Sequence, residues 1–138
     1  MTLSYKRYLI PILGIGFLIW LLATIAFRAA GQFFFITDSP VILSILYIIV
    51  VPVLGLVTVL TCRKFRLKGL ENVVAGVLLV LPGMLIDTFV IQFFGDVFPN
   101  MPTNRAATFG SWLMWAYTIV LITSLIIGLR QSAKQTIK

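Results

Sequence analysis

Four long apolar segments, separated by short polar stretches, dominate the chain. They cover residues 8–27, 41–62, 70–94 and 108–129. A helix needs about 20 apolar residues to cross the hydrocarbon core of a bilayer, which is about 30 Å thick. Because every segment has this length, the pattern predicts an all-α membrane protein, an antiparallel bundle of four transmembrane helices.

Charges and turn residues mark the boundaries of these segments. Lys6 and Arg7 precede the first segment, and Asp38-Ser39-Pro40 offers an N-cap and a first-turn proline to the second. The first segment exceeds the roughly 7–15 apolar residues of a signal peptide, so we expect it to remain as a membrane span. We expect residues 1–138 to form a single integral membrane domain.

Basic residues are distributed unequally between the two sides of the predicted bundle. One side has nine Lys and Arg residues, and the other has Arg28 and Arg105. Because Lys and Arg are enriched in cytoplasmic loops, nine against two predicts that both termini are cytoplasmic. The expected partner is therefore the lipid bilayer and not nucleic acid. The nine are Lys6, Arg7, Arg63, Lys64, Arg66, Lys68, Arg130, Lys134 and Lys138.

The composition agrees with a membrane protein and limits the chemistry. The chain is 60% apolar and 11% charged, whereas soluble domains average about 45–50% and 25%. It has no histidine and one cysteine, Cys62. This inventory excludes disulfides within the chain, zinc hydrolysis and Ser-His-Asp catalysis, so we expect no catalytic residue, cofactor or metal. Cys62 is expected to be a small packing residue.

One carboxylate, Asp87, lies inside the third apolar segment, in the stretch "VLPGMLIDTFVIQFF". It shares a helix face with Gly76 and Gly83, so it should point into the bundle. An ionisable group within a span needs a partner and is a candidate functional site. Arg28 lies at a similar predicted depth, which makes Arg28–Asp87 the candidate pair. The supporting polar residues are Thr24, Gln32, Gln92 and Tyr117.

Two prolines fall near the middle of their segments. Pro52 and the Pro82-Gly83 dipeptide are predicted midplane helix breaks, because proline removes a helix hydrogen bond. Such breaks occur as packing kinks and also in transporter binding sites. Small residues form stripes at helical spacing, for example Gly110, Tyr117, Ser124 and Gly128, which favours close helix packing.

Phenylalanines gather at the predicted outer ends of the segments. They indicate either an interfacial aromatic belt or an apolar cap with a lipid-binding vestibule. The residues concerned are Phe27, Phe33, Phe34, Phe35, Phe89, Phe93, Phe94, Phe98 and Phe109.

Three stretches, "GFLIWLLATIAFRAAGQFFF", "LPGMLIDTFVIQFFGDVFPNMP" and "FGSWLMWAYTIVLIT", together extend over most of the chain. They resemble a family of small bacterial four-span membrane proteins that is defined only as a domain of unknown function. The resemblance implies a multi-pass protein of the bacterial inner (plasma) membrane. It implies no reaction, ligand or site residue.

Three functions are compatible with the sequence. The first is a non-catalytic membrane protein that packs with itself or with a larger membrane complex, and it predicts a dry, filled bundle. The second is a small oligomeric transporter or channel that uses Arg28 and Asp87, and it predicts access to Asp87. The third and weakest is a lipid-handling enzyme, because few polar residues are available to catalyse a reaction.

Overall fold

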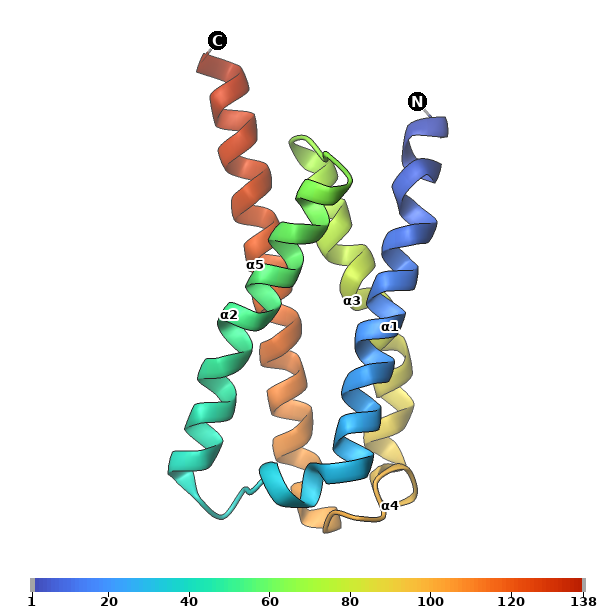
Figure 1. The fold of residues 1–138 in the computed structure, drawn as a ribbon, viewed down its shortest axis with the longest axis vertical. Helices are drawn as coiled ribbons and strands as arrows, with labels where there is room; N and C mark the ends of the chain where they lie inside the picture. The colour runs from blue at the N-terminus through green and yellow to red at the C-terminus, as the bar shows by residue number, and fades with distance from the viewer. Residues whose placement is uncertain (1, 138) are drawn as a thin grey trace.

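The computed structural model describes the backbone of residues 2–137 and the side chains of residues 7–134. The orientation count above includes Lys6 and Lys138, whose side chains lie outside the described residues. Within the described backbone every regular element is helical (Figure 1). The elements are α1 (Thr2–Phe34), α2 (Pro40–Lys64), α3 (Leu70–Gln92), α4 (Phe94–Val97), the 3₁₀ helix η1 (Thr103–Arg105) and α5 (Ala106–Ile137).

Helices α1, α2, α3 and α5 are long and apolar enough to cross a membrane. The four predicted spans are therefore confirmed as four membrane-capable helices. Three of them are longer than their apolar segments, because α1 continues to Phe34, α2 to Lys64 and α5 to Ile137. The predicted start of α2 is also present. Pro40 is its first residue, and the Ser39 hydroxyl accepts a hydrogen bond from the Ile42 N–H at 3.4 Å.

The predicted helix breaks at Pro52 and Pro82-Gly83 do not end their helices. Each proline lies inside a continuous helix, as does Pro11 in α1. A proline removes one backbone hydrogen bond but does not have to end a membrane helix, because neighbouring groups can satisfy the freed carbonyl.

Helix α3 is central, and it packs mainly against α5 and α1. Small residues allow this close approach, since a Cβ added at Gly76 would collide with the Ser124 side chain and one at Gly16 with the Leu79 carbonyl. Gly83 likewise lies against Tyr117. The predicted stripes of α3 and α5 thus meet. Gly76 lies against Ser124, and the later residue Gly83 lies against the earlier residue Tyr117, so these two helices run in opposite directions.

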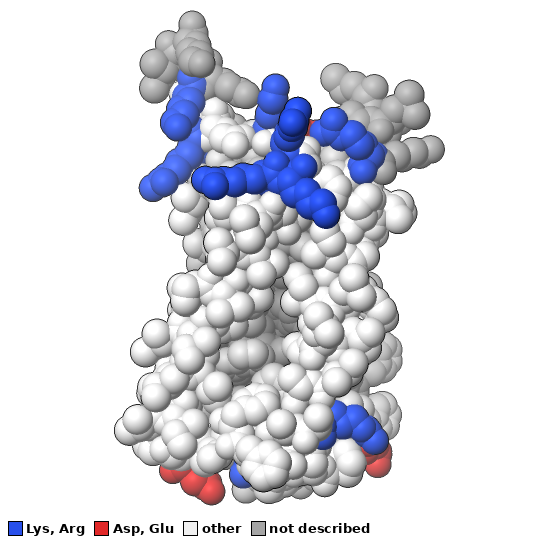
Figure 2. Space-filling view, in the orientation of Figure 1, with Lys and Arg blue, Asp and Glu red and all other residues white. Residues whose placement is uncertain are grey.

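Helix α2 packs mainly on α5 and hardly contacts α3. Figure 1 shows that α2 crosses in front of α5, that α1 lies to the right of α2, and that both termini lie at one end of the molecule, here called the terminal end. Lys and Arg side chains gather at the terminal end (Figure 2).

The opposite end, here called the aromatic end, contains α4, η1 and a buried aromatic cluster. The Phe27 ring is central to this cluster, with centroids 4.9 Å from Phe109 and 5.4 Å from Phe35. Phe94 and Phe98 are also buried there, whereas Phe33, Phe89 and Phe93 are exposed. Most of the phenylalanines therefore form a packed cap, and the remaining three face outward as in a belt.

Candidate functional site

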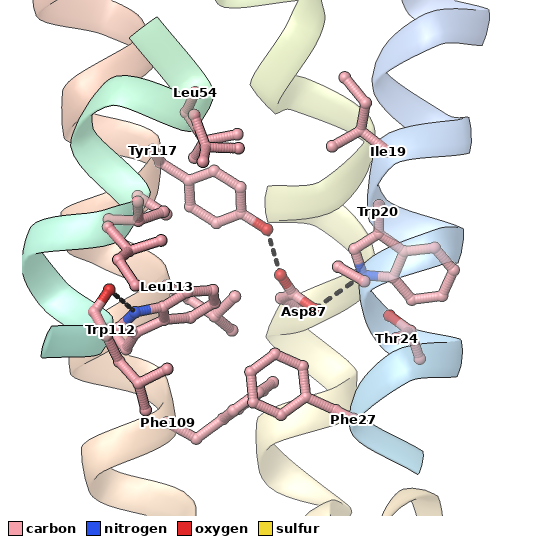
Figure 3. Close-up of a pocket in the computed structure, with 16 residues that line it drawn as sticks. Ile19, Trp20, Thr24, Phe27, Leu54, Asp87, Phe109, Trp112, Leu113 and Tyr117 are labelled. Atoms are coloured by element: carbon pink, nitrogen blue, oxygen red, sulfur yellow. Dashed lines mark hydrogen bonds between the residues drawn. The ribbon is translucent and has the colours of Figure 1, made fainter. Parts of the chain in front are cut away.

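A cavity of about 310 Å³ lies between α1 and α2, with α5 and α3 behind it (Figure 3). The space-filling view shows the same face hollowed near mid-height (Figure 2). Almost all of the lining is aliphatic or aromatic, and Asp87 is the one charged residue in it. The labelled lining residues are Ile19, Trp20, Thr24, Phe27, Leu54, Asp87, Phe109, Trp112, Leu113 and Tyr117.

Asp87 is held by two neutral donors from two other helices. The residue is 4% exposed. Trp20 of α1 donates its indole N–H to Oδ1 at 2.8 Å, and Tyr117 of α5 donates its hydroxyl to Oδ2. The carboxylate therefore connects α1, α3 and α5. Each of these bonds to a charged acceptor contributes roughly 1.5–3 kcal/mol.

Gly83 lets Tyr117 reach the carboxylate. It lies one helical turn before Asp87, and a Cβ built on it would be 2.7 Å from the Tyr117 hydroxyl and 3.3 Å from its ring. A side chain at this position would displace the tyrosine ring. Gly83 therefore matters for the space that it leaves.

The predicted Arg28–Asp87 pair is wrong. Both oxygens of Asp87 are used by Trp20 and Tyr117, and the Arg28 guanidinium donates to the Val97 carbonyl at 2.7 Å. Arg28 follows the buried Phe27 by one residue and is turned about 100° around the helix from it. Arg28 is exposed and contacts the polar backbone at the aromatic end, where a charged group loses less hydration.

The supporting polar residues divide between the cavity and the aromatic end. Thr24 lines the cavity together with Tyr117. Gln32 instead accepts a hydrogen bond from the Asn100 side chain, which also donates to the Phe27 carbonyl at 2.9 Å. Gln92 is exposed at the end of α3.

Two indoles of α5 fix the α2 wall of the cavity. Trp112 donates to the Leu46 carbonyl at 3.2 Å, and Trp115 donates to the Tyr47 carbonyl at 2.9 Å. Both acceptors lie in the α2 turns before Pro52. These bonds hold α2 on α5 and away from α1, so the cavity stays open between α1 and α2.

Sequence reasoning missed Trp20 and Trp112, although a signal for Trp20 was present. Trp20, Thr24, Phe27 and Gly31 follow one another at helical steps of four, three and four. This spacing places an indole donor on the same face as the residues that pack inward.

The site combines one carboxylate with several aromatic rings and no cationic side chain. Trp20, Phe27, Trp112 and Tyr117 supply the rings. Aromatic faces and carboxylates both attract cations. A search of the described residues found no group of three or more His, Cys, Asp or Glu side chains placed to hold a metal ion. The arrangement therefore suits an organic cation better than a metal ion.

A family model described as a family of unknown function, DUF5367, matches residues 34–131. This range includes α2, α3, α4 and most of α5, and thus Asp87 and Tyr117. Comparisons with curated proteins and with solved structures found no significant match.

Proposed function

We propose that this chain, which belongs to DUF5367, a family of unknown function, is a non-catalytic membrane protein that binds a small amphipathic organic cation in the cavity between α1 and α2. Because the function of the family is unknown, the proposal is inferred from the chain's own site. The observation that supports this proposal is the buried carboxylate of Asp87 in an aromatic cavity, with two neutral donors as its partners.

The charge of Asp87 is the first reason. Removing a carboxylate from water is costly unless a counter-charge or hydrogen bonds compensate it. Trp20 and Tyr117 supply hydrogen bonds but no positive charge. A cation in the cavity would supply that charge, and a desolvated cation–aromatic contact contributes about 2 kcal/mol.

The shape of the cavity is the second reason. It lies between α1 and α2, which pack mainly on α3 and on α5 respectively. In a bilayer this opening would face acyl chains. An amphipathic ligand could therefore place its cationic head beside Asp87 and leave its apolar tail in the lipid. At about 310 Å³, the cavity is at the lower end of the range for ligand pockets.

We also propose an antiparallel bundle in the bacterial inner membrane, with both termini cytoplasmic. The excess of basic residues on that side supports this orientation. Asp87 lies 17 residues beyond the start of α3 at Leu70, which is about 26 Å along the helix at 1.5 Å per residue. The cavity would then open in the outer half of the bilayer.

A small oligomeric transporter is the second candidate. It is favoured by the cavity that reaches Asp87, because a carrier can exchange a proton on a carboxylate for a cationic substrate. A second copy of the chain would supply the rest of a translocation pathway. The lipid-handling enzyme gains no support, since Asp87 and Tyr117 are the only ionisable residues that line the cavity.

The test uses two ligands of nearly identical shape, phenyltrimethylammonium and the neutral tert-butylbenzene. Binding is measured by calorimetry on the full chain in lipid nanodiscs, with empty nanodiscs as the reference. We expect the cation to bind at least about tenfold more tightly than the neutral compound, a difference of roughly 1.4 kcal/mol. Equal affinity of the two ligands would overturn the proposal without any variant.

Asp87→Asn and Asp96→Asn form the matched pair of variants. Both remove one negative charge, but Asp96 is exposed in α4 at the aromatic end. Asp87→Asn should abolish the preference for the cation, and Asp96→Asn should retain it. If the two variants lose the preference equally, the cation is held by the general field of the protein and not by this cavity.

A further inference from the structure

A second cavity, of about 490 Å³, lies at the terminal end between the last turns of α2 and the C-terminal part of α5. It shares no lining residue with the cavity at Asp87. Four cationic side chains converge on it from α2, from the loop after α2 and from α5. They are Arg63, Arg66, Arg130 and Lys134.

These cations have no acidic partner within the described side chains. The chain contains four acidic residues, and Glu71 is the one at this end. Its carboxylate accepts a hydrogen bond from the Lys68 N–H at 3.2 Å and does not line the cavity. Four positive charges around one hollow repel one another, so an anion bound between them would stabilise the arrangement. Basic pockets between membrane helices on the cytoplasmic side are suited to phospholipid headgroups.

The backbone at Arg66 gives an independent indication. Helix α2 ends with the Leu67 N–H bonded to the Cys62 carbonyl and the Arg66 N–H bonded to the Arg63 carbonyl, each at 3.1 Å. In this helix-ending motif the residue at the position of Arg66 has a positive φ and is usually glycine. Arg66 has φ 52°, a conformation that is unfavourable for a residue with a Cβ. The backbone conformation favours glycine, so the presence of arginine at this position indicates a role for its side chain.

We propose that this cavity binds the phosphate group of a phosphate ester. The phosphate lies among the guanidinium groups of Arg63, Arg66 and Arg130. A phosphatidylglycerol headgroup and free glycerol phosphate have the same chemistry. The first would come from the bilayer and the second from the cytoplasm.

The experiment measures lipid binding to the full chain in neutral detergent by native mass spectrometry. Phosphatidylglycerol is compared with phosphatidylcholine of the same acyl chains, which also contains a phosphate but has no net charge. Free glycerol phosphate is then added as a competitor. The variants are Arg66→Gly and, as the matched control, Lys64→Gln, which removes one charge from the same helix end outside the cavity.

We expect phosphatidylglycerol to bind several-fold more tightly than phosphatidylcholine. Arg66→Gly should weaken phosphatidylglycerol binding about tenfold, the change produced by roughly 1.4 kcal/mol, and Lys64→Gln should leave it unchanged. Glycine is preferred at this backbone position, so Arg66→Gly should fold at least as stably as the wild type.

Displacement by millimolar glycerol phosphate would identify the soluble ester as the ligand, and retention of the lipid would identify the headgroup. Either result supports a phosphate site. Equal binding of phosphatidylglycerol and phosphatidylcholine would overturn the proposal, because the cavity would then not select an anion. Equal losses in the two variants would also overturn it, because they indicate attraction by net charge alone.

Discussion

Gly83→Ala is the substitution that most severely perturbs the geometry around Asp87. The added methyl group would lie 2.7 Å from the Tyr117 hydroxyl and 3.3 Å from its ring, well inside van der Waals contact. The ring has to move, because the methyl group is fixed to the α3 backbone. Movement of the ring removes the hydrogen bond from Tyr117 to Asp87.

The expected loss has two parts. Forcing an extra methyl group into a packed interface costs about 1–3 kcal/mol, and leaving a buried acceptor without its donor costs about 1–3 kcal/mol. These terms overlap, because one displacement of Tyr117 produces both. We therefore expect a total destabilisation of roughly 2–4 kcal/mol, a large value for a single substitution.

Gly14→Ala in α1 is the matched control, since a Cβ at Gly14 has no atom within 4 Å. It should be neutral or slightly stabilising, because alanine favours helix over glycine by about 1 kcal/mol. Reversible unfolding of both variants in mixed micelles, followed by circular dichroism, gives the comparison. If Gly83→Ala is as stable as Gly14→Ala, Tyr117 does not occupy the space over Gly83, and the reasoning about Asp87 fails.

Three further predictions concern the helices around the cavity. Trp20→Phe keeps most of the ring but removes the indole donor to Asp87, so it should lower stability by roughly 1.5–3 kcal/mol in the same unfolding assay; an unchanged stability would contradict this bond. Arg28→Gln should destabilise less than Trp20→Phe, because Arg28 is exposed and bonds one carbonyl, that of Val97 at the end of α4; a larger loss for Arg28→Gln would support the predicted pair of Arg28 with Asp87. Ser39→Ala removes the N-cap of α2 and should cost about 1 kcal/mol, whereas Ser39→Asp should keep most of that stability.

Hydropathy predicted the four membrane-capable helices because length and apolar content decide whether a helix can cross a bilayer. The pattern of small residues also predicted which faces of α3 and α5 meet. A stripe of glycine and serine can be recognised from residue spacing within a single helix. The face that packs closely can therefore be predicted without knowing the rest of the fold. Gly76 against Ser124 and Gly83 against Tyr117 are the contacts that result.

The partner of Asp87 could not be predicted in the same way. Depth along the helices places Arg28 near Asp87, but the choice of partner depends on which way each side chain points. A turn of about 100° per residue separates Phe27, which is buried, from Arg28, which is exposed. The indole of Trp20 reaches Asp87 instead, and its long side chain makes that contact hard to infer from residue spacing.

The cavity is a consequence of helix packing that the sequence pattern does not contain. Trp112 and Trp115 bond to backbone carbonyls of α2, and such acceptors are available at every helical residue in a sequence. Only the arrangement of α2 on α5 shows which carbonyls are used. The same arrangement separates α2 from α1 and opens the space in front of Asp87.

The central claim, that a cation binds beside Asp87, is tested most directly by the indole N–H signals of the three tryptophans in an NMR titration. Trp20 and Trp112 line the cavity, whereas Trp115 lies on the outer face of α5, beside Tyr47 and Pro52. Addition of phenyltrimethylammonium should shift the Trp20 and Trp112 signals with one dissociation constant and leave Trp115 unchanged. If Trp20 does not shift, or if all three signals shift together as they would with membrane partitioning, the cavity does not bind the cation.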